Sequence, residues 1–63
     1  MNIHFQHNET VYQLQYLPAN RAYMFNRFDH GYCGITRIIQ DKEEALAFYN
    51  DQVAFYKKVK GIE

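Results

Sequence analysis

The sequence predicts an α+β fold in two layers, in which an antiparallel meander of three to four strands packs one face against a single C-terminal helix. Two observations predict this fold. Between residues 2 and 39, apolar and polar residues alternate in short runs separated by turn-forming residues, which is typical of half-buried strands. From residue 41 onward, apolar residues recur at helical spacing. The chain has 63 residues with no repeat and no linker, so we expect residues 1–63 to form a single small domain.

Four segments have the composition of strands. Residues 2–6 (NIHFQ) alternate, and residues 11–17 (VYQLQYL) place three large apolar side chains on one face and two glutamines on the other. Residues 20–29 (NRAYMFNRFD) form the third predicted strand, and a fourth lies within residues 33–39. The intervening segments HNET, PAN and DHG are rich in turn formers. Antiparallel neighbours joined by such short turns predict a meander.

The C-terminal helix has signals at both ends. Asp41 is a good N-cap, and Glu44 stands three residues further on, at capping-box spacing. Acidic residues in the first turn and lysines in the last turn complement the helix dipole, and Gly61 ends the helix. These signals predict a helix from just after Asp41 to just before Gly61.

The apolar face of this helix is wider than packing on one sheet requires, and the excess lies on the side that carries Phe48 and Phe55. In one interpretation, both rings are core because the sheet curls around the helix. In the other, they form a contact edge for a second copy of the chain or for another protein. We predict a protein contact through Phe48, Phe55 and Tyr49.

The register of the second and third strands decides whether the aromatic and arginine face of the third strand points to solvent or to the helix. If the loop is the three residues 18–20, the face that carries the third strand's aromatic rings points to solvent. If the loop contains two or four residues, those rings face the helix. Turn chemistry favours the first loop, because Pro, Ala and Asn suit a type I turn followed by a left-handed residue. Burying a ring stabilises the fold by a few kcal/mol, whereas a preferred turn contributes about 1 kcal/mol or less. We therefore favour the loop of two or four residues, which turns the rings toward the helix. The residues concerned are Arg21, Tyr23, Phe25 and Arg27.

The sequence contains no convincing catalytic set. It has no serine and no glycine-rich loop before the helix, which excludes serine nucleophiles and a phosphate cradle. His30 and Cys33 have the spacing of a base and a thiolate, and with His4 and His7 they have a loose resemblance to a metal site. A lone cysteine is far more often a buried apolar side chain, and zinc sites of this kind normally have at least two cysteines. We therefore expect no enzymatic activity, no cofactor and no metal.

Charge and aromatic content indicate what the protein binds. The formal net charge is zero, which disfavours general binding to phosphate backbones, and six tyrosines and five phenylalanines exceed what one small core needs. We expect a small accessory or regulatory protein that acts as a protein–protein interaction module, with a homodimer as one form. The alternative is a single-stranded nucleic-acid-binding module that uses the aromatic and arginine face of the third strand.

Location follows from the same features. The sequence has one cysteine, no membrane-length apolar run and no apolar stretch near its start that resembles a signal peptide. We expect a cytoplasmic protein that does not contact a membrane.

Overall fold

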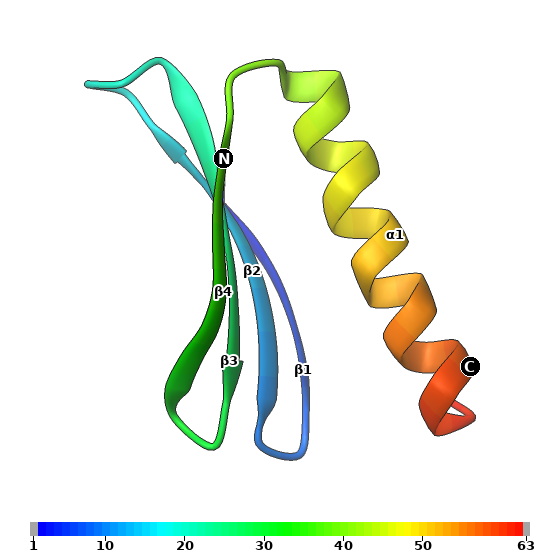
Figure 1. Cartoon of the computed structure of the whole chain (residues 1–63). Helices are drawn as coiled ribbons and strands as arrows, with labels where there is room; N and C mark the ends of the chain where they lie inside the picture. Colours follow the sequence, from blue (N-terminus) through cyan, green and yellow to red (C-terminus); the bar gives the residue numbers. More distant parts are fainter. Residues whose placement is uncertain (1, 63) are drawn as a thin grey trace.

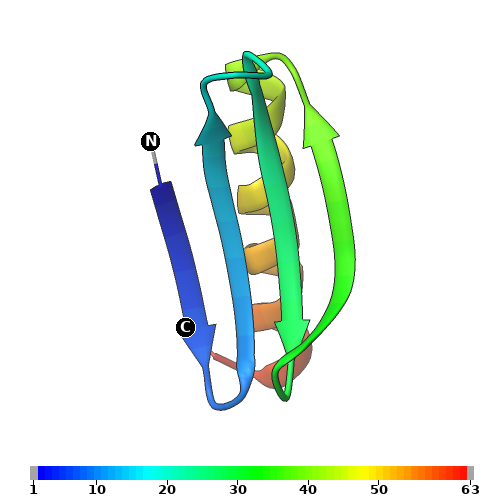
Figure 2. The ribbon, with the colours of Figure 1, turned by 90° about the vertical axis from the view of Figure 1, so that its left-hand side faces the viewer.

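The computed structural model describes residues 2–62 and confirms the predicted α+β meander (Figure 1). Four antiparallel strands form one open sheet in the order β1-β2-β3-β4, and the helix covers one face of it (Figure 2). The elements are β1 (Asn2–His7), β2 (Thr10–Leu17), β3 (Ala22–Asp29), β4 (Tyr32–Ile39) and α1 (Lys42–Lys60). The short turns keep strands that follow one another in the sequence adjacent in the sheet, so β1 and β4 are its two edges.

The pairing of β2 with β3 confirms the register that buries the aromatic rings. Tyr16 lies opposite Tyr23, and Leu17 lies opposite Ala22, so the loop contains the four residues 18–21. The left-handed residue is Arg21, with φ of 49°, rather than the asparagine before it. A left-handed arginine is less favourable than a left-handed asparagine by a small amount. Burial of the rings outweighs that cost.

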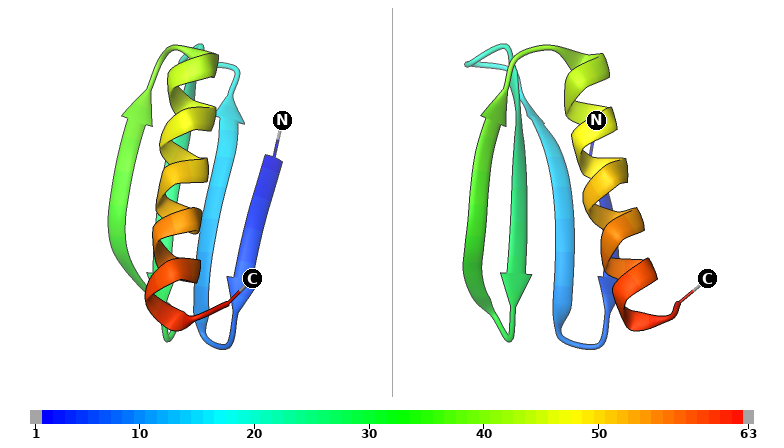
Figure 3. Two further views of the ribbon diagram at one scale, coloured as in Figure 1. Left: turned by 90° about the vertical axis from the view of Figure 1, so that its right-hand side faces the viewer. Right: turned by 45° about the vertical axis from the view of Figure 1, so that its right-hand side comes forward.

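The helix begins and ends as predicted. The Asp41 carboxylate accepts a hydrogen bond from the backbone N–H of Glu44 at 2.9 Å, and Gly61 adopts a left-handed conformation with φ of 70°. Glycine suits this position because it has no Cβ to clash there. Viewed from the helix side, α1 runs along the sheet above β2 and β3 (Figure 3).

The core lies between α1 and the two central strands. Phe25 is fully buried, and its ring meets those of Tyr12, Phe48 and Tyr49 edge-on at centroid distances of 5.9, 4.9 and 6.4 Å. Edge-on ring contacts of this kind add to the free energy of apolar burial. The buried hydrophobic cluster comprises Tyr12, Leu14, Phe25, Ala45, Tyr49, Val53 and Tyr56.

Two residues that alternation places on the open face of the sheet are nevertheless buried. Ala22 is small and is covered by its neighbours, and Asn26 lies in the middle of the sheet. The Thr36 hydroxyl donates a hydrogen bond to Asn26 Oδ1 at 2.9 Å, which satisfies the amide oxygen. The open face is therefore less exposed at its centre than the sequence pattern predicts.

The C-terminal end of α1 contacts β1. Tyr56 Oη and His7 Nδ1 lie 3.0 Å apart, at hydrogen-bonding distance, and the Lys57 ammonium lies 5.1 Å from the centre of the Phe5 ring. These contacts hold β1 against the helix. At the other edge, β4 contacts α1 near the start of the helix, where the Arg37 guanidinium lies 4.9 Å from the Phe48 ring centre.

Candidate protein-interaction surface

Exposed large apolar side chains gather at one edge of the molecule. Within residues 2–62, all of them lie on β4 or on the side of α1 that faces β4: Tyr32, Ile35, Ile38, Phe55 and Val59. Phe55 is 66% exposed and Val59 is 63% exposed. Together with the half-buried Phe48, they form what we call the α1–β4 surface. Scattered apolar residues are normal on a protein surface, but their concentration at one edge is typical of an interaction site.

The path of α1 explains this exposure. Near its start, the helix packs against β4, because the Phe48 ring lies under the Arg37 guanidinium at 4.9 Å from its centre. Near its end, the helix packs against β1 through Tyr56 and Lys57. The helix therefore leans away from β4 toward its C-terminus (Figure 1). Phe55 and Phe48 lie on the same side of the helix, but Phe55 is 66% exposed whereas Phe48 is half-buried.

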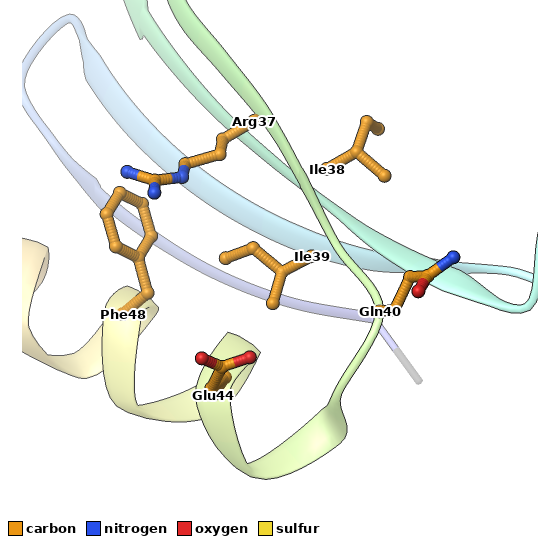
Figure 4. Close-up of a pocket in the computed structure, with 6 residues that line it drawn as sticks. All are labelled: Arg37, Ile38, Ile39, Gln40, Glu44 and Phe48. Carbon is orange, nitrogen blue, oxygen red and sulfur yellow. The ribbon is translucent and has the colours of Figure 1, made fainter.

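A groove of about 600 Å³ lies where α1 and β4 approach each other. Arg37 and Ile39 extend from β4 toward the helix, and Ile38 points to the other face of the sheet (Figure 4). Phe48 and Glu44 line the helix side. The groove therefore combines apolar walls with one cation and one anion, a combination that suits binding of a mixed polar and apolar chain.

The three residues predicted to contact a protein occupy different environments. Phe55 is exposed, and Phe48 is half-buried between Phe25 and Arg37. Tyr49 is only 7% exposed and belongs to the core, where burial raises the pKa of its phenol. Tyr49 therefore stabilises the fold and is not accessible to a partner, because helical geometry turns it toward the sheet while Phe55 faces outward.

The four residues of the alternative nucleic-acid site do not form an exposed stacking surface. Phe25 is fully buried, and Tyr23 packs under the helix beside Tyr16. Arg21 lies apart in the turn before β3. This arrangement is that of the favoured register, which turns both rings toward α1 and leaves no exposed platform for the nucleic-acid alternative.

Arg27 also has a structural role on the helix side of the sheet. Its Nη2 lies 3.0 Å from Asp29 Oδ2, and its guanidinium carbon lies 5.7 Å from the Tyr12 ring centre. The pKa of Tyr12 is raised, chiefly by burial, although the positive charge of Arg27 opposes this shift. Arg27 is therefore paired within the chain, although its side chain and that of Asp29 are each about one-third exposed.

The histidines and the cysteine are separated from one another. His7 contacts Tyr56, His30 pairs with Glu9, and Cys33 Sγ lies 3.1 Å from the Thr36 hydroxyl. Successive side chains of a strand point to opposite faces of the sheet. His4 and His7 are three positions apart, so they lie on opposite faces of β1. Within residues 2–62, no group of three or more His, Cys, Asp or Glu side chains is close enough to hold a metal ion.

Sequence reasoning found the helix part of the surface and missed the strand part. Ile35 and Ile38 lie on opposite faces of β4, and both are exposed. A strand that is apolar on both faces is usually buried in the middle of a sheet. The run ITRII is the sequence feature that could have indicated these residues. It leads to exposed isoleucines because β4 lies at the edge of the sheet.

The described part of the chain has no helix that is long and apolar enough to cross a membrane. Comparisons with protein-family models, curated proteins and solved structures found no match. The fold and the α1–β4 surface therefore define this protein as a small α+β domain with one uncovered apolar edge.

Proposed function

We propose that this chain is a non-enzymatic protein–protein interaction module, a small accessory or regulatory protein that binds a protein partner through the α1–β4 surface. The observation that carries the proposal is the position of the exposed apolar side chains, which all lie at this edge among residues 2–62. Several exposed apolar side chains near one edge cost solubility when they are uncovered. Binding of a partner removes that cost.

Phe55 is the natural anchor residue for the partner. A phenylalanine has roughly 200 Å² of side-chain surface, so covering an exposed fraction of 66% removes about 130 Å² from water. At about 25 cal/mol per Å², this burial contributes up to about 3 kcal/mol to binding. Aromatic anchors of this size dominate the binding energy of many interfaces.

The charges around the surface support a protein rather than a nucleic acid as the ligand. Arg37 is the only charged residue of β4, and Glu44 lies across the groove from it. Within the groove, one cation and one anion do not make the basic surface that phosphate backbones require, and the lysines beside Val59 stand in a chain of zero net charge. The two groove charges suit the polar rim of a protein interface, where charges set orientation.

The proposal is tested by capture from an extract of the native host, followed by binding measurements with the purified partner. Phe55→Asp places a charge in the anchor position, and Ala54→Asp places the same charge on the neighbouring exposed helix position that faces away from β4. We expect wild type and Ala54→Asp to bind the partner equally, and Phe55→Asp to bind at least about tenfold more weakly. Equal binding by Phe55→Asp, or no protein bound by wild type, overturns the proposal.

A further inference from the structure

We propose that the outer edge of β4 is a binding site for a second copy of this chain, and that the two β4 strands pair antiparallel about a two-fold axis. This inference goes beyond the proposed function, because it concerns the backbone edge of β4 and leaves Phe55 to the protein partner. The four strands of each copy would then form one continuous eight-stranded sheet. Three observations carry the inference: the direction of the backbone groups of β4, its composition, and its self-complementarity.

The backbone directions follow from the hydrogen-bond pattern of the sheet. The His30 N–H donates to the Glu9 carbonyl at 2.9 Å, in line with the β2–β3 ladder. Bonded and non-bonded pairs alternate along an antiparallel ladder. Continuing the alternation, Gln13 bonds Asn26, whereas Phe25 points its backbone groups away from β2 and toward β4.

The same alternation assigns the edge groups of β4. Phe25 lies opposite Arg37 and Tyr23 lies opposite Ile39, so Arg37 and Ile39 bond back to β3. The intervening residues Thr36 and Ile38 therefore present their N–H and C=O groups outward, where no strand within residues 2–62 meets them. An unpaired edge of this kind is a template for another strand.

The composition of β4 does not protect this edge. Natural edge strands are usually short, or carry charges or proline. β4 has eight residues, one charge and no proline, and Ile35 and Ile38 are exposed on its two faces. Its one irregularity, where Arg27 and Phe28 pair with Ile35 and Cys33, lies before the residues 36–38 that present the outward groups. The other edge, β1, has six residues and its outward positions are polar. We therefore expect an added strand to pair with β4 rather than with β1.

Self-complementarity favours a second copy as the occupant. When two β4 strands pair about Thr36, the outward groups of Thr36 meet those of Thr36 of the second copy. Arg37 then lies opposite Ile35 of the second copy, so the two arginines do not oppose each other. The net charge of zero adds no general repulsion between copies.

The paired sheet leaves space between the two helices. α1 lies above β2 and β3, and strands are about 4.8 Å apart, so the two helix axes would lie roughly 19 Å apart. Packed helices need only about 8–10 Å, so the helices would not touch. Phe55 and Val59 of both copies would line the groove between them. The second copy therefore pairs with β4 and leaves Phe55 accessible to the protein partner proposed above.

Two proline variants test the inference by sedimentation at tens of micromolar. Ile38→Pro removes an outward N–H that the β3–β4 ladder does not use, so the fold tolerates it and the pairing does not. His4→Pro is the matched control, because it removes an outward N–H from the polar edge, β1. We expect wild type and His4→Pro to be dimers and Ile38→Pro to be a monomer with unchanged helix content.

Amide hydrogen exchange of the wild type keeps the test independent of the variants' folding. We expect the Thr36 and Ile38 amides to be protected at high concentration and to lose protection on dilution, while the His4 amide exchanges fast throughout. A monomeric wild type, a dimeric Ile38→Pro or unprotected Thr36 and Ile38 amides overturn the inference. A monomer that still binds another protein through Phe55 leaves the proposed function standing, so the two failures are distinguishable.

Discussion

Replacing Phe25 by alanine removes the ring at the centre of the core. The side chain is fully buried and three aromatic rings surround it, at centroid distances between 4.9 and 6.4 Å. Phe→Ala changes in such positions cost about 3–5 kcal/mol, because burial is lost and a cavity remains. A chain of 63 residues has a total stability of roughly 3–9 kcal/mol, so this one change removes a third or more of it.

Met24 provides the comparison, because it precedes Phe25 on β3 and points to the open face of the sheet. It is only partly buried, so we expect Met24→Ala to cost well under half as much. Phe25→Leu keeps most of the volume and serves as a folded variant if Phe25→Ala does not fold. The assay is urea unfolding followed by circular dichroism, which gives each free energy of unfolding. If Phe25→Ala leaves the free energy of unfolding nearly unchanged and Met24→Ala lowers it strongly, the register and the core described above are wrong.

Two further predictions concern pH and metal. Burial raises the pKa of Tyr49, so its contribution to stability is present below about pH 10 and is lost as pH rises further. In urea unfolding from about pH 8 to 11, Tyr49→Phe is expected to lose less stability than wild type, and an equal loss contradicts the assignment. A strong chelator is expected to leave the thermal midpoint unchanged, since a structural metal contributes folding free energy directly. A fall in midpoint that zinc restores would refute this expectation and direct mutagenesis to His4, His7, His30 and Cys33.

The register of β2 and β3 could be predicted because one local comparison decides it. Facing Tyr23 and Phe25 inward buries two large rings, and facing them outward satisfies only the preferred turn. The structure buries Phe25 completely and accepts a left-handed Arg21 in the turn. Helix ends could be predicted for the same reason, since Asp41 and Gly61 act on their immediate neighbours.

The candidate site could be predicted only in part, because it depends on long-range arrangement. The excess apolar width of the helix indicated Phe48 and Phe55, but the pattern could not show that α1 leans toward β1 and leaves Phe55 uncovered. The predicted meander makes the last strand an edge, but the pattern did not show that Ile38 is left exposed on the open face of that strand. The exposure of Phe55 depends on how α1 crosses the strands, and that of Ile38 depends on what covers the open face of the sheet; no local sequence pattern encodes either.

The order of elements along the chain has a consequence for synthesis. All four strands precede α1, and the helix supplies the cover for Phe25 and Leu14. Until α1 has been synthesised and has packed on the strands, the helix gives their aromatic face no cover. A sheet with one bare apolar face and two open edges is prone to aggregate. Slow translation of the helix would therefore lower the yield of folded protein, and a chaperone that shields the nascent strands would raise it.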